Sequence, residues 1–315
     1  MKIAILSQLW PDALAWLQSH HECTIAINPD PPGLRHLLAT AEVVVLRSPV
    51  KLDADALKHA GHLRLVVRAG MGIDGIDIAA ARSCGMTVVS VPLSAQSVAE
   101  HTFALMLALH RRIPWYHRSL QQNGWEKHRA YNHDIHGKTL GLIGFGRIGI
   151  RTAQLARAFG MTLCACDRSP EKPHKQAAAA QFGVRFVDLP SLLRESDVVA
   201  IQAPLDAGTR NLIGAAQLAL MKPGAFLINV GRGGIVREDD LFTALQEDRI
   251  GGAALDVFAT EPPLNHPLLA LDNFIGTPHV AGQTVEAQEH IGREVVRIID
   301  AWPDGLSPER FHLVA

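Results

Sequence analysis

Short apolar runs alternate with amphipathic segments along the first 90 residues of this 315-residue chain. The segments between the runs have the period of helices. Strict alternation of strands and helices predicts a parallel sheet with helices on both of its faces. These residues therefore predict a small α/β unit that has no glycine-rich phosphate turn. Its predicted strands are residues 2–6, 23–27, 42–46, 63–67 and 86–90.

A long apolar segment follows this unit, "SVAEHTFALMLALHRRIP" at residues 97–114. Ser97 and Glu100 have the spacing of a capping box, in which each side chain binds a backbone N–H group of the other residue. We therefore expect a helix that starts at Ser97 and stops or kinks at Pro114. Its place before a second α/β pattern makes it a candidate hinge between domains.

The alternation restarts at Lys138 and continues to His279. A final helical run, residues 284–302, has no predicted strand after it, so we expect it to pack back on the first unit. This predicts a discontinuous first domain, residues 1–94 and 284–315, with a second domain, residues 95–283, inserted into it. The predicted strands of the second domain are residues 139–144, 162–167, 184–187, 197–202, 225–230, 251–258 and 273–279.

The composition is that of a globular protein, with 48% hydrophobic and 19% charged residues. The formal net charge is −1, and no basic block interleaves with aromatic residues, so we expect no nucleic-acid partner. No apolar run is long enough to span a bilayer, and the first ten residues lack the apolar core of a signal peptide. Four cysteines do not make a disulfide framework in a chain of this length. The prediction is a cytoplasmic protein without a membrane partner.

Gly144, Gly146 and Gly149 form a G-x-G-x-x-G sequence between a predicted strand and a predicted helix. The first glycine allows a tight turn, the second lets the backbone approach a pyrophosphate, and the third lets the helix pack closely on the strand. The next strand ends in Asp167, at the place where an acid binds the ribose hydroxyls of NAD. Asp167 would repel a 2′-phosphate, so we expect NAD rather than NADP, although Arg168 is able to pair with such a phosphate.

Candidate catalytic residues follow three predicted strands of the second domain. They are Arg232 in "INVGRGGIV", Asp256 and Glu261 in "LDVFATEPPL", and His279 in "GTPHVAGQT". Ligands bind at this edge of open α/β sheets. Histidine exchanges protons near neutral pH, a carboxylate fixes its tautomer, and arginine binds carboxylates with two hydrogen bonds. Each residue taken separately is equally well explained as an ordinary loop or turn residue.

Together these sequences resemble the D-isomer-specific 2-hydroxyacid dehydrogenase family over essentially the whole chain. The resemblance implies a flavodoxin-like substrate domain with an inserted Rossmann NAD-binding domain, and a small 2-hydroxy or 2-keto acid bound in the cleft between them. It also implies a homodimer, for which "WYHRSLQQNGW" offers Trp115, Tyr116 and Trp125 as contact residues; packing of these residues within the monomer is the other explanation. The matching runs are residues 97–114, 137–149, 229–236, 255–263 and 277–288.

The resemblance also implies roles for individual residues. His279 would protonate the substrate carbonyl, Glu261 would orient His279, and Arg232 would bind the substrate carboxylate. Asp256 would hold the nicotinamide carboxamide, and Pro204 would line the adenine pocket. The expected cofactor-binding set is Gly144, Gly146, Arg147, Ile148, Gly149, Asp167, Pro204, Val230, Asp256 and Gly282. The expected substrate-binding set is Arg47, Ser48, Arg68, Met71 and Gly72, of which Met71 and Gly72 would offer backbone N–H groups.

The choice of substrate depends on Arg47 and Arg68, which close two predicted strands of the first domain. Two arginines beyond Arg232 favour a second anionic group on the substrate, and their surroundings look most like D-3-phosphoglycerate dehydrogenases. We therefore expect 3-phosphoglycerate and phosphohydroxypyruvate as the substrate pair. Ion pairs of these arginines with Asp53 or Asp74 are the competing explanation. A glyoxylate or hydroxypyruvate reductase, or another D-2-hydroxyacid dehydrogenase, is then the alternative.

Other classes of function remain open on the sequence. An NAD-sensing corepressor related to this family could retain the same catalytic residues. Formate dehydrogenases have glutamine in place of Glu261, which disfavours that assignment. A metal site at Cys164 and Cys166 lacks further ligands at zinc spacing, and the close histidines of "HDIH" (133–136) are more often solvated surface residues than ligands. One departure from the family pattern is Asp206, where threonine is usual.

Overall fold

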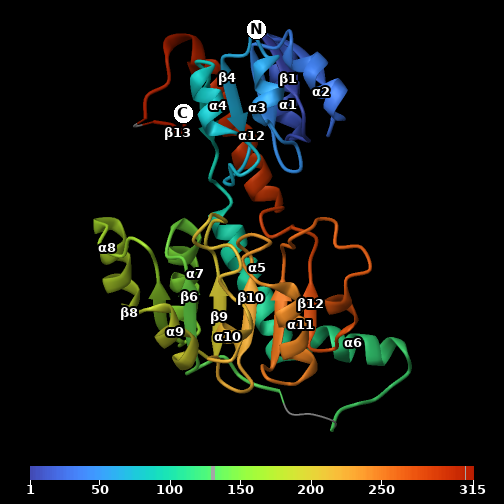
Figure 1. Cartoon of the computed structure of the whole chain (residues 1–315), viewed down its shortest axis with the longest axis vertical. Helices are drawn as coiled ribbons and strands as arrows, with labels where there is room; N and C mark the ends of the chain where they lie inside the picture. The colour runs from blue at the N-terminus through green and yellow to red at the C-terminus, as the bar shows by residue number, and fades with distance from the viewer. Residues whose placement is uncertain (129–131, 309) are drawn as a thin grey trace. The chain divides into compact units, whose positions relative to one another are not determined.

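The computed structural model describes residues 1–128, 132–308 and 310–315. The chain divides into two compact units (Figure 1). The first unit contains Met1–Ser94 and Gln283–Ala315, and the second unit contains Ala95–Gly282.

The sheet of the first unit has the strand order β13-β5-β4-β3-β1-β2. Strands β1 to β5 are parallel and have the 2-1-3-4-5 order of flavodoxin-like folds. The strands are β1 (Lys2–Ile5), β2 (Glu22–Ile25), β3 (Val43–Leu46), β4 (Leu65–Arg68), β5 (Thr87–Ser90) and β13 (His312–Leu313). The helices are α1 (Pro11–His20), α2 (Pro31–Leu38), α3 (Ala54–Lys58), α4 (Ile78–Ser83) and α12 (Val285–Ala301). Helices α2, α3 and α4 pack on one face of the sheet, and α1 and α12 pack on the other.

Helix α12 belongs to the core of the first unit. It buries Ile291, Val295, Ile298 and Ile299 against the strands and α1. The prediction that no strand follows this helix is wrong, because β13 pairs antiparallel with β5. A strand of two residues is too short to show an alternating pattern in the sequence.

The sheet of the second unit is parallel, with the order β12-β11-β10-β9-β6-β7-β8 of a Rossmann fold. Each strand predicted here is confirmed: β6 (Thr139–Ile143), β7 (Thr162–Cys166), β8 (Val184–Phe186), β9 (Val198–Ile201), β10 (Phe226–Asn229), β11 (Gly252–Leu255) and β12 (Phe274–Gly276). Helices α5 (Ala95–His110), α7 (Arg147–Ala158) and α8 (Pro173–Phe182) pack on one face. Helices α9 (Leu189–Glu195), α10 (Ala215–Leu218) and α11 (Glu238–Gln246) pack on the other.

The predicted capping box of α5 is wrong. The helix begins at Ala95, so Ser97 lies inside its first turn and is not the N-cap. Glu100 accepts a hydrogen bond from the side chain of Gln96 at 2.8 Å instead. Alanine and glutamine favour helix, which extends α5 toward the N-terminus. The helix ends at His110, and Pro114 lies in the first turn of the next helix, α6 (Ile113–Gln121).

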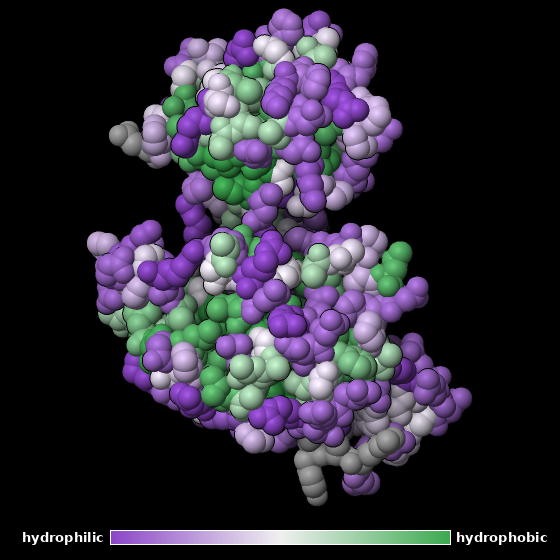
Figure 2. All heavy atoms as spheres, viewed as in Figure 1, coloured by the Kyte–Doolittle hydropathy of each residue, from purple (hydrophilic) through white to green (hydrophobic). Residues whose placement is uncertain are grey.

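Hydrophilic side chains cover most of the visible face of both units, with hydrophobic residues between them (Figure 2). None of the helices in the described part of the chain has the length and apolar character needed to cross a membrane.

Candidate active site

The glycine-rich turn joins β6 to α7 in the second unit. Gly144 has a φ of +94°, and Gly149 lies so close to it that an added Cβ would stand 2.6 Å from the Gly144 carbonyl oxygen. No atom lies within 4 Å of the Cβ position of Gly146, at the N-cap of α7. The first and third glycines therefore serve packing, while the second leaves open space at a helix N-terminus, which attracts anions. These features fit a pyrophosphate.

Asp167 follows β7 and is tied to the glycine-rich turn. Its Oδ2 accepts a hydrogen bond from the Phe145 backbone N–H at 2.8 Å. Its Oδ1 accepts from the Ser169 N–H at 2.8 Å and from Lys175 Nζ at 2.5 Å. Burial alone would raise the pKa of Asp167, but Lys175 and the two N–H groups bring it below its usual value. The group is therefore a carboxylate, as binding of ribose hydroxyls requires.

His279 and Glu261 form a hydrogen-bonded pair, with 2.9 Å between His279 Nδ1 and Glu261 Oε2. Their side chains are 38% and 37% exposed, so the pair is accessible from solvent. The other oxygen of Glu261 accepts from the Phe258 N–H at 3.1 Å. Burial raises the pKa of Glu261, but His279, the Phe258 N–H and the charge of Arg232 lower it below the usual value. The three predicted catalytic residues therefore interact: His279 is hydrogen-bonded to Glu261, and the charge of Arg232 acts on the same carboxylate.

Arg232 sits in a tightly held loop after β10. The buried Asn229 side chain donates to the Arg232 carbonyl oxygen at 2.9 Å and accepts from the Gly231 N–H at 3.0 Å. A Cβ at Gly233 would lie 1.8 Å from the Phe258 carbonyl oxygen. The loop of Arg232 therefore packs against the chain segment that leads to Glu261.

Asp256 organises the loop that carries His279. Its carboxylate accepts hydrogen bonds from Thr277 Oγ1 at 2.6 Å, from the Val280 N–H at 2.9 Å and from the Ala281 N–H at 3.0 Å. The Asp256 side chain is 1% exposed. The His279 N–H also donates to the Asp256 carbonyl oxygen, and His279 has a φ of +54°, which is uncommon for residues other than glycine. The predicted contact of Asp256 with the nicotinamide carboxamide stays a prediction.

His101 joins this network from α5, and the sequence analysis missed it. Its Nε2 lies 3.1 Å from Thr277 Oγ1 and 3.6 Å from Asp256 Oδ1. The residue is 155 positions before Asp256 in the chain, so no local spacing could have indicated the contact.

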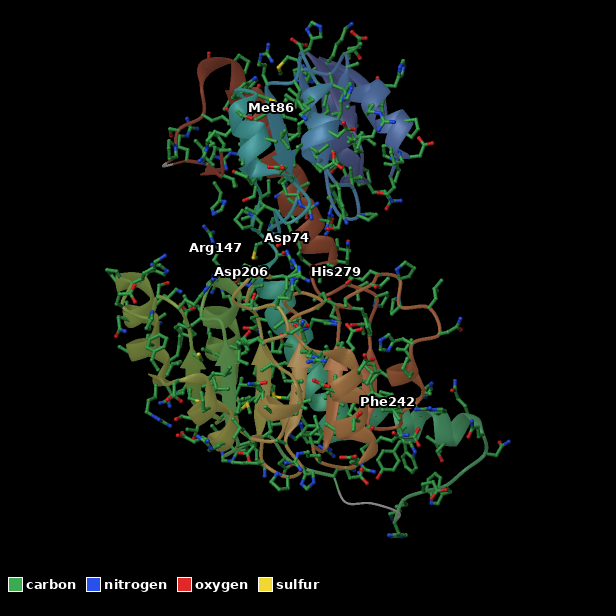
Figure 3. The ribbon with its side chains drawn as sticks, viewed as in Figure 1. Asp74, Met86, Arg147, Asp206, Phe242 and His279 are labelled. Carbon is green, nitrogen blue, oxygen red and sulfur yellow. The ribbon has the colours of Figure 1, made fainter. Side chains whose placement is uncertain are left out.

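Along the edge where the strands of the second unit end lie Arg147, Asp206 and His279 (Figure 3). Arg147 and Ile148 start α7, and Val230 follows β10. Pro204 follows β9, and its carbonyl oxygen accepts from Thr209 Oγ1 at 2.7 Å. Gly282 ends the second unit.

The predicted substrate residues of the first unit follow β3 and β4. Arg68 is 9% exposed; its Nε donates to the Gly72 carbonyl oxygen at 2.6 Å, and its Nη2 donates to Ser48 Oγ at 2.8 Å. Arg68 therefore joins the turn after β3 to the turn of Met71 and Gly72. Arg47 donates to Gln288 Oε1, and burial lowers the pKa of its guanidinium.

Arg47 and Ser48 line a cavity of about 790 Å³ within the first unit. The cavity lies at the carboxyl ends of β1, β2 and β3, and Trp10, Leu14 and Ile27 form part of its apolar wall. Asp53, one of the proposed ion-pair partners of these arginines, accepts from the Ala56 N–H and caps α3.

Comparison with known proteins identifies the class. Residues 103–281 match the sequence model of the D-isomer specific 2-hydroxyacid dehydrogenase, NAD binding domain. This chain belongs to that family, and its second unit is an NAD-binding domain.

Individual relatives extend the match over the whole chain. A D-3-phosphoglycerate dehydrogenase of Methanocaldococcus jannaschii is 41% identical over 95% of this chain and 57% of its own length. A hydroxypyruvate reductase of Thermotoga maritima is 40% identical over 84% of this chain and 86% of its own length. The solved D-lactate dehydrogenase of Aquifex aeolicus, complexed with NAD and lactic acid, has a TM-score of 0.85 at 29% identity and covers 96% of both chains. The chain thus spans somewhat more than half of the first of these relatives.

Proposed function

We propose that this chain is an NAD-dependent dehydrogenase that interconverts a small 2-keto acid and the corresponding D-2-hydroxy acid. The observation that carries the proposal is the His279–Glu261 pair, 2.9 Å apart, with the charge of Arg232 acting on the same carboxylate. In this assignment residues 1–94 and 284–315 are the substrate domain, and residues 95–283 are the cofactor domain.

The cofactor, when bound, supplies or accepts the hydride. Gly146 leaves the N-terminus of α7 open to the pyrophosphate, and Asp167 accepts hydrogen bonds from the ribose hydroxyls. The ionised Asp167 also repels a 2′-phosphate, so we propose a preference for NADH over NADPH.

The geometry of the His279–Glu261 pair indicates which ring nitrogen of His279 donates the proton. Because Nδ1 of His279 faces Glu261, Nε2 is the ring atom that gives a proton to the carbonyl oxygen during keto-acid reduction. Arg232 binds the substrate carboxylate and polarises the neighbouring keto group. In the first unit, Met71 and Gly72 are proposed to offer backbone N–H groups to the substrate, as the resemblance to the family implies.

Replacing Glu261 with glutamine should lower the alkaline pH limit of keto-acid reduction. His279 lowers the pKa of Glu261, so this group is a carboxylate whose charge attracts the protonated imidazole, and glutamine keeps the shape but lacks that charge. Reduction uses the protonated form, whereas hydroxy-acid oxidation uses the neutral form and should keep its alkaline range. The measurement is kcat against pH in both directions; identical profiles for E261Q and the wild type would count against the pairing.

The proposed function is tested by NADH oxidation with glyoxylate, hydroxypyruvate, phosphohydroxypyruvate, pyruvate and longer 2-keto acids. We expect steady turnover of at least one of them. Binding of NADH without turnover of any of these 2-keto acids would contradict the proposed dehydrogenase activity and favour a cofactor-sensing protein.

Within this class we propose phosphohydroxypyruvate and 3-phosphoglycerate as the substrate pair. Arg47 supports the proposal, because its guanidinium lines the cavity of the first unit and donates there to the uncharged side chain of Gln288. The dehydrogenase of Methanocaldococcus jannaschii carries this activity in its name, whereas the Thermotoga maritima relative is a hydroxypyruvate reductase. Arg68 donates to Gly72 and to Ser48, so we expect it to support substrate binding mainly by fixing the shape of the two turns that carry these residues.

Replacing Arg47 with alanine should remove the advantage of the phosphorylated substrate. The loss expected is about 1.5–3 kcal/mol, the scale of a hydrogen bond to a charged group, or roughly 10–150-fold in kcat/KM. Glyoxylate reduction needs no second anion site, so its kcat/KM should be nearly unchanged. The matched control is Arg35→Ala, which removes an exposed arginine of α2. Equal efficiency of the wild type with phosphohydroxypyruvate and hydroxypyruvate would favour a glyoxylate or hydroxypyruvate reductase instead.

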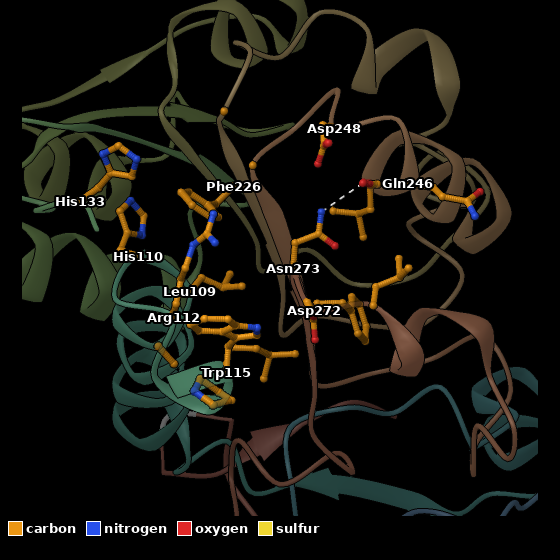
Figure 4. Close-up of a pocket in the computed structure, with 18 of the residues that line it drawn as sticks. Leu109, His110, Arg112, Trp115, His133, Phe226, Gln246, Asp248, Asp272 and Asn273 are labelled. Atoms are coloured by element: carbon orange, nitrogen blue, oxygen red, sulfur yellow. Dashed lines mark hydrogen bonds between the residues drawn. The ribbon is translucent and has the colours of Figure 1, made fainter. Parts of the chain in front are cut away.

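We also propose a homodimer that uses the region of α6. Trp125 is 79% exposed, and Ile113 and Leu120 are also exposed apolar side chains. Beside α6 lies a cavity of about 630 Å³, at the edge of the second unit where β10, β11 and β12 begin, with Trp115 and Phe226 among its lining residues (Figure 4). Sedimentation should give twice the mass of the chain, and Leu120→Glu should shift it toward the monomer. A wild-type monomer at micromolar concentration would contradict the proposal.

A further inference from the structure

We propose that Asp206 sets the cofactor preference of the second unit by occupying Arg168, the cation that would otherwise bind a 2′-phosphate. The inference rests on the proposed role of Asp167 at the adenosine ribose.

The position of the ion pair is fixed by the sheet. Arg168 follows β7 and Asp206 follows β9, and β6 lies between these two strands. Arg168 Nη1 and Asp206 Oδ2 are 2.7 Å apart. The pair therefore connects the loops on both sides of β6, the strand that leads into the glycine-rich turn.

The Asp206 carboxylate is oriented by its own loop. Its Oδ1 accepts from the Gly208 N–H at 2.8 Å, and its backbone N–H donates to Thr209 Oγ1 at 2.8 Å. Some desolvation raises the pKa of Asp206, but the Gly208 N–H and Arg168 lower it below its usual value. Asp206 is therefore an anion at neutral pH, with its second oxygen directed to the guanidinium.

Lys175 is a second cation near Asp167, and it is already engaged in an ion pair. Lys175 on α8 is 8% exposed, and its Nζ lies 2.5 Å from Asp167 Oδ1 and 3.2 Å from Ser169 Oγ. Lys175 thus offsets part of the Asp167 charge, which weakens the repulsion that Asp167 exerts on a phosphate. A strong preference for NAD over NADP therefore needs a second group that disfavours the 2′-phosphate, at the edge where the strands of the second unit end.

Asp206 supplies that contribution in two ways. A 2′-phosphate carries nearly two negative charges at neutral pH, and a free arginine next to Asp167 would bind it with two charge-assisted hydrogen bonds. Asp206 holds the guanidinium of Arg168 and adds an anion of its own. The pair is exposed, so it contributes little to folding stability, and its removal should leave the fold intact.

The test measures dissociation constants of NADH and NADPH by calorimetry, without substrate. Asp206→Asn keeps the acceptor for the Gly208 N–H but lacks the charge. We expect it to lower the Kd of NADPH roughly 10–100-fold, the range of a charge-assisted hydrogen bond, and to change the Kd of NADH less than about 3-fold. Adding Arg168→Ala to this variant should abolish the gain. Asp248→Asn, at the opposite edge of the second unit, makes the same charge change and should alter neither constant.

The outcomes separate this inference from the proposed function. Normal NADH binding with an unchanged Kd of NADPH in Asp206→Asn would overturn the role of Asp206. A gain that persists in the double variant would overturn the role of Arg168. Wild-type protein that binds neither dinucleotide would contradict the proposed cofactor, and the inference with it.

Discussion

Replacing His279 with alanine is expected to lower kcat for keto-acid reduction by roughly 10²–10⁴-fold, the usual contribution of a positioned acid or base. The variant loses the Nε2 proton donor, but the glycine-rich turn and Asp167 remain as they are. The Kd of NADH should therefore change little. Steady-state kinetics and calorimetry on the same preparation measure the two quantities.

The matched control is His290→Ala, which removes an exposed histidine from α12. It should leave both kcat and the Kd of NADH at wild-type values. A H279A variant with wild-type kcat and weakened NADH binding would show that this histidine serves the cofactor and not the proton transfer.

Replacing Gly146 with valine is expected to weaken NADH binding by roughly 10–150-fold, the scale of losing a hydrogen bond to a charged group. The Cβ position of Gly146 faces open space, so the first atom of the added side chain meets no neighbour in the folded protein. It does fill the space that a pyrophosphate needs at the start of α7. Calorimetry measures the affinity, and thermal unfolding confirms that the fold persists.

Gly149→Ala provides the contrast within the same turn. Its Cβ would stand 2.6 Å from the Gly144 carbonyl oxygen, so this variant should lower the melting temperature. A Gly146→Val variant that binds NADH as tightly as the wild type would contradict the placement of the pyrophosphate.

The sequence predicted the sheets well because their strands are buried. In β3 and β9, for example, every residue is buried, which produces the continuous apolar runs typical of parallel sheets. The start of α5 and strand β13 were mispredicted for local reasons. Ser97 and Glu100 have the spacing of a capping box, but the helix formers before Ser97 extend α5 to Ala95, so Ser97 lies inside the helix. Strand β13 has only two residues, which is too short to show an alternating pattern.

The candidate site was predictable as far as it follows strand ends and family motifs. His279, Glu261 and Arg232 each lie in such a segment, and the structure groups them as expected. Contacts between segments distant in the chain left no sequence signal. The bonds of His101 to Thr277 and of Arg168 to Asp206 depend on strand order and could be found only in the folded chain.

The central claim is that this chain reduces a 2-keto acid through a proton from His279. The most direct measurement follows NADH oxidation with hydroxypyruvate and phosphohydroxypyruvate and identifies the product by chiral chromatography, with H279A in parallel. The account predicts one D-2-hydroxy acid for each NADH consumed, and a rate at least about 100-fold lower in H279A. An L-product, or equal rates in the wild type and H279A, would contradict it.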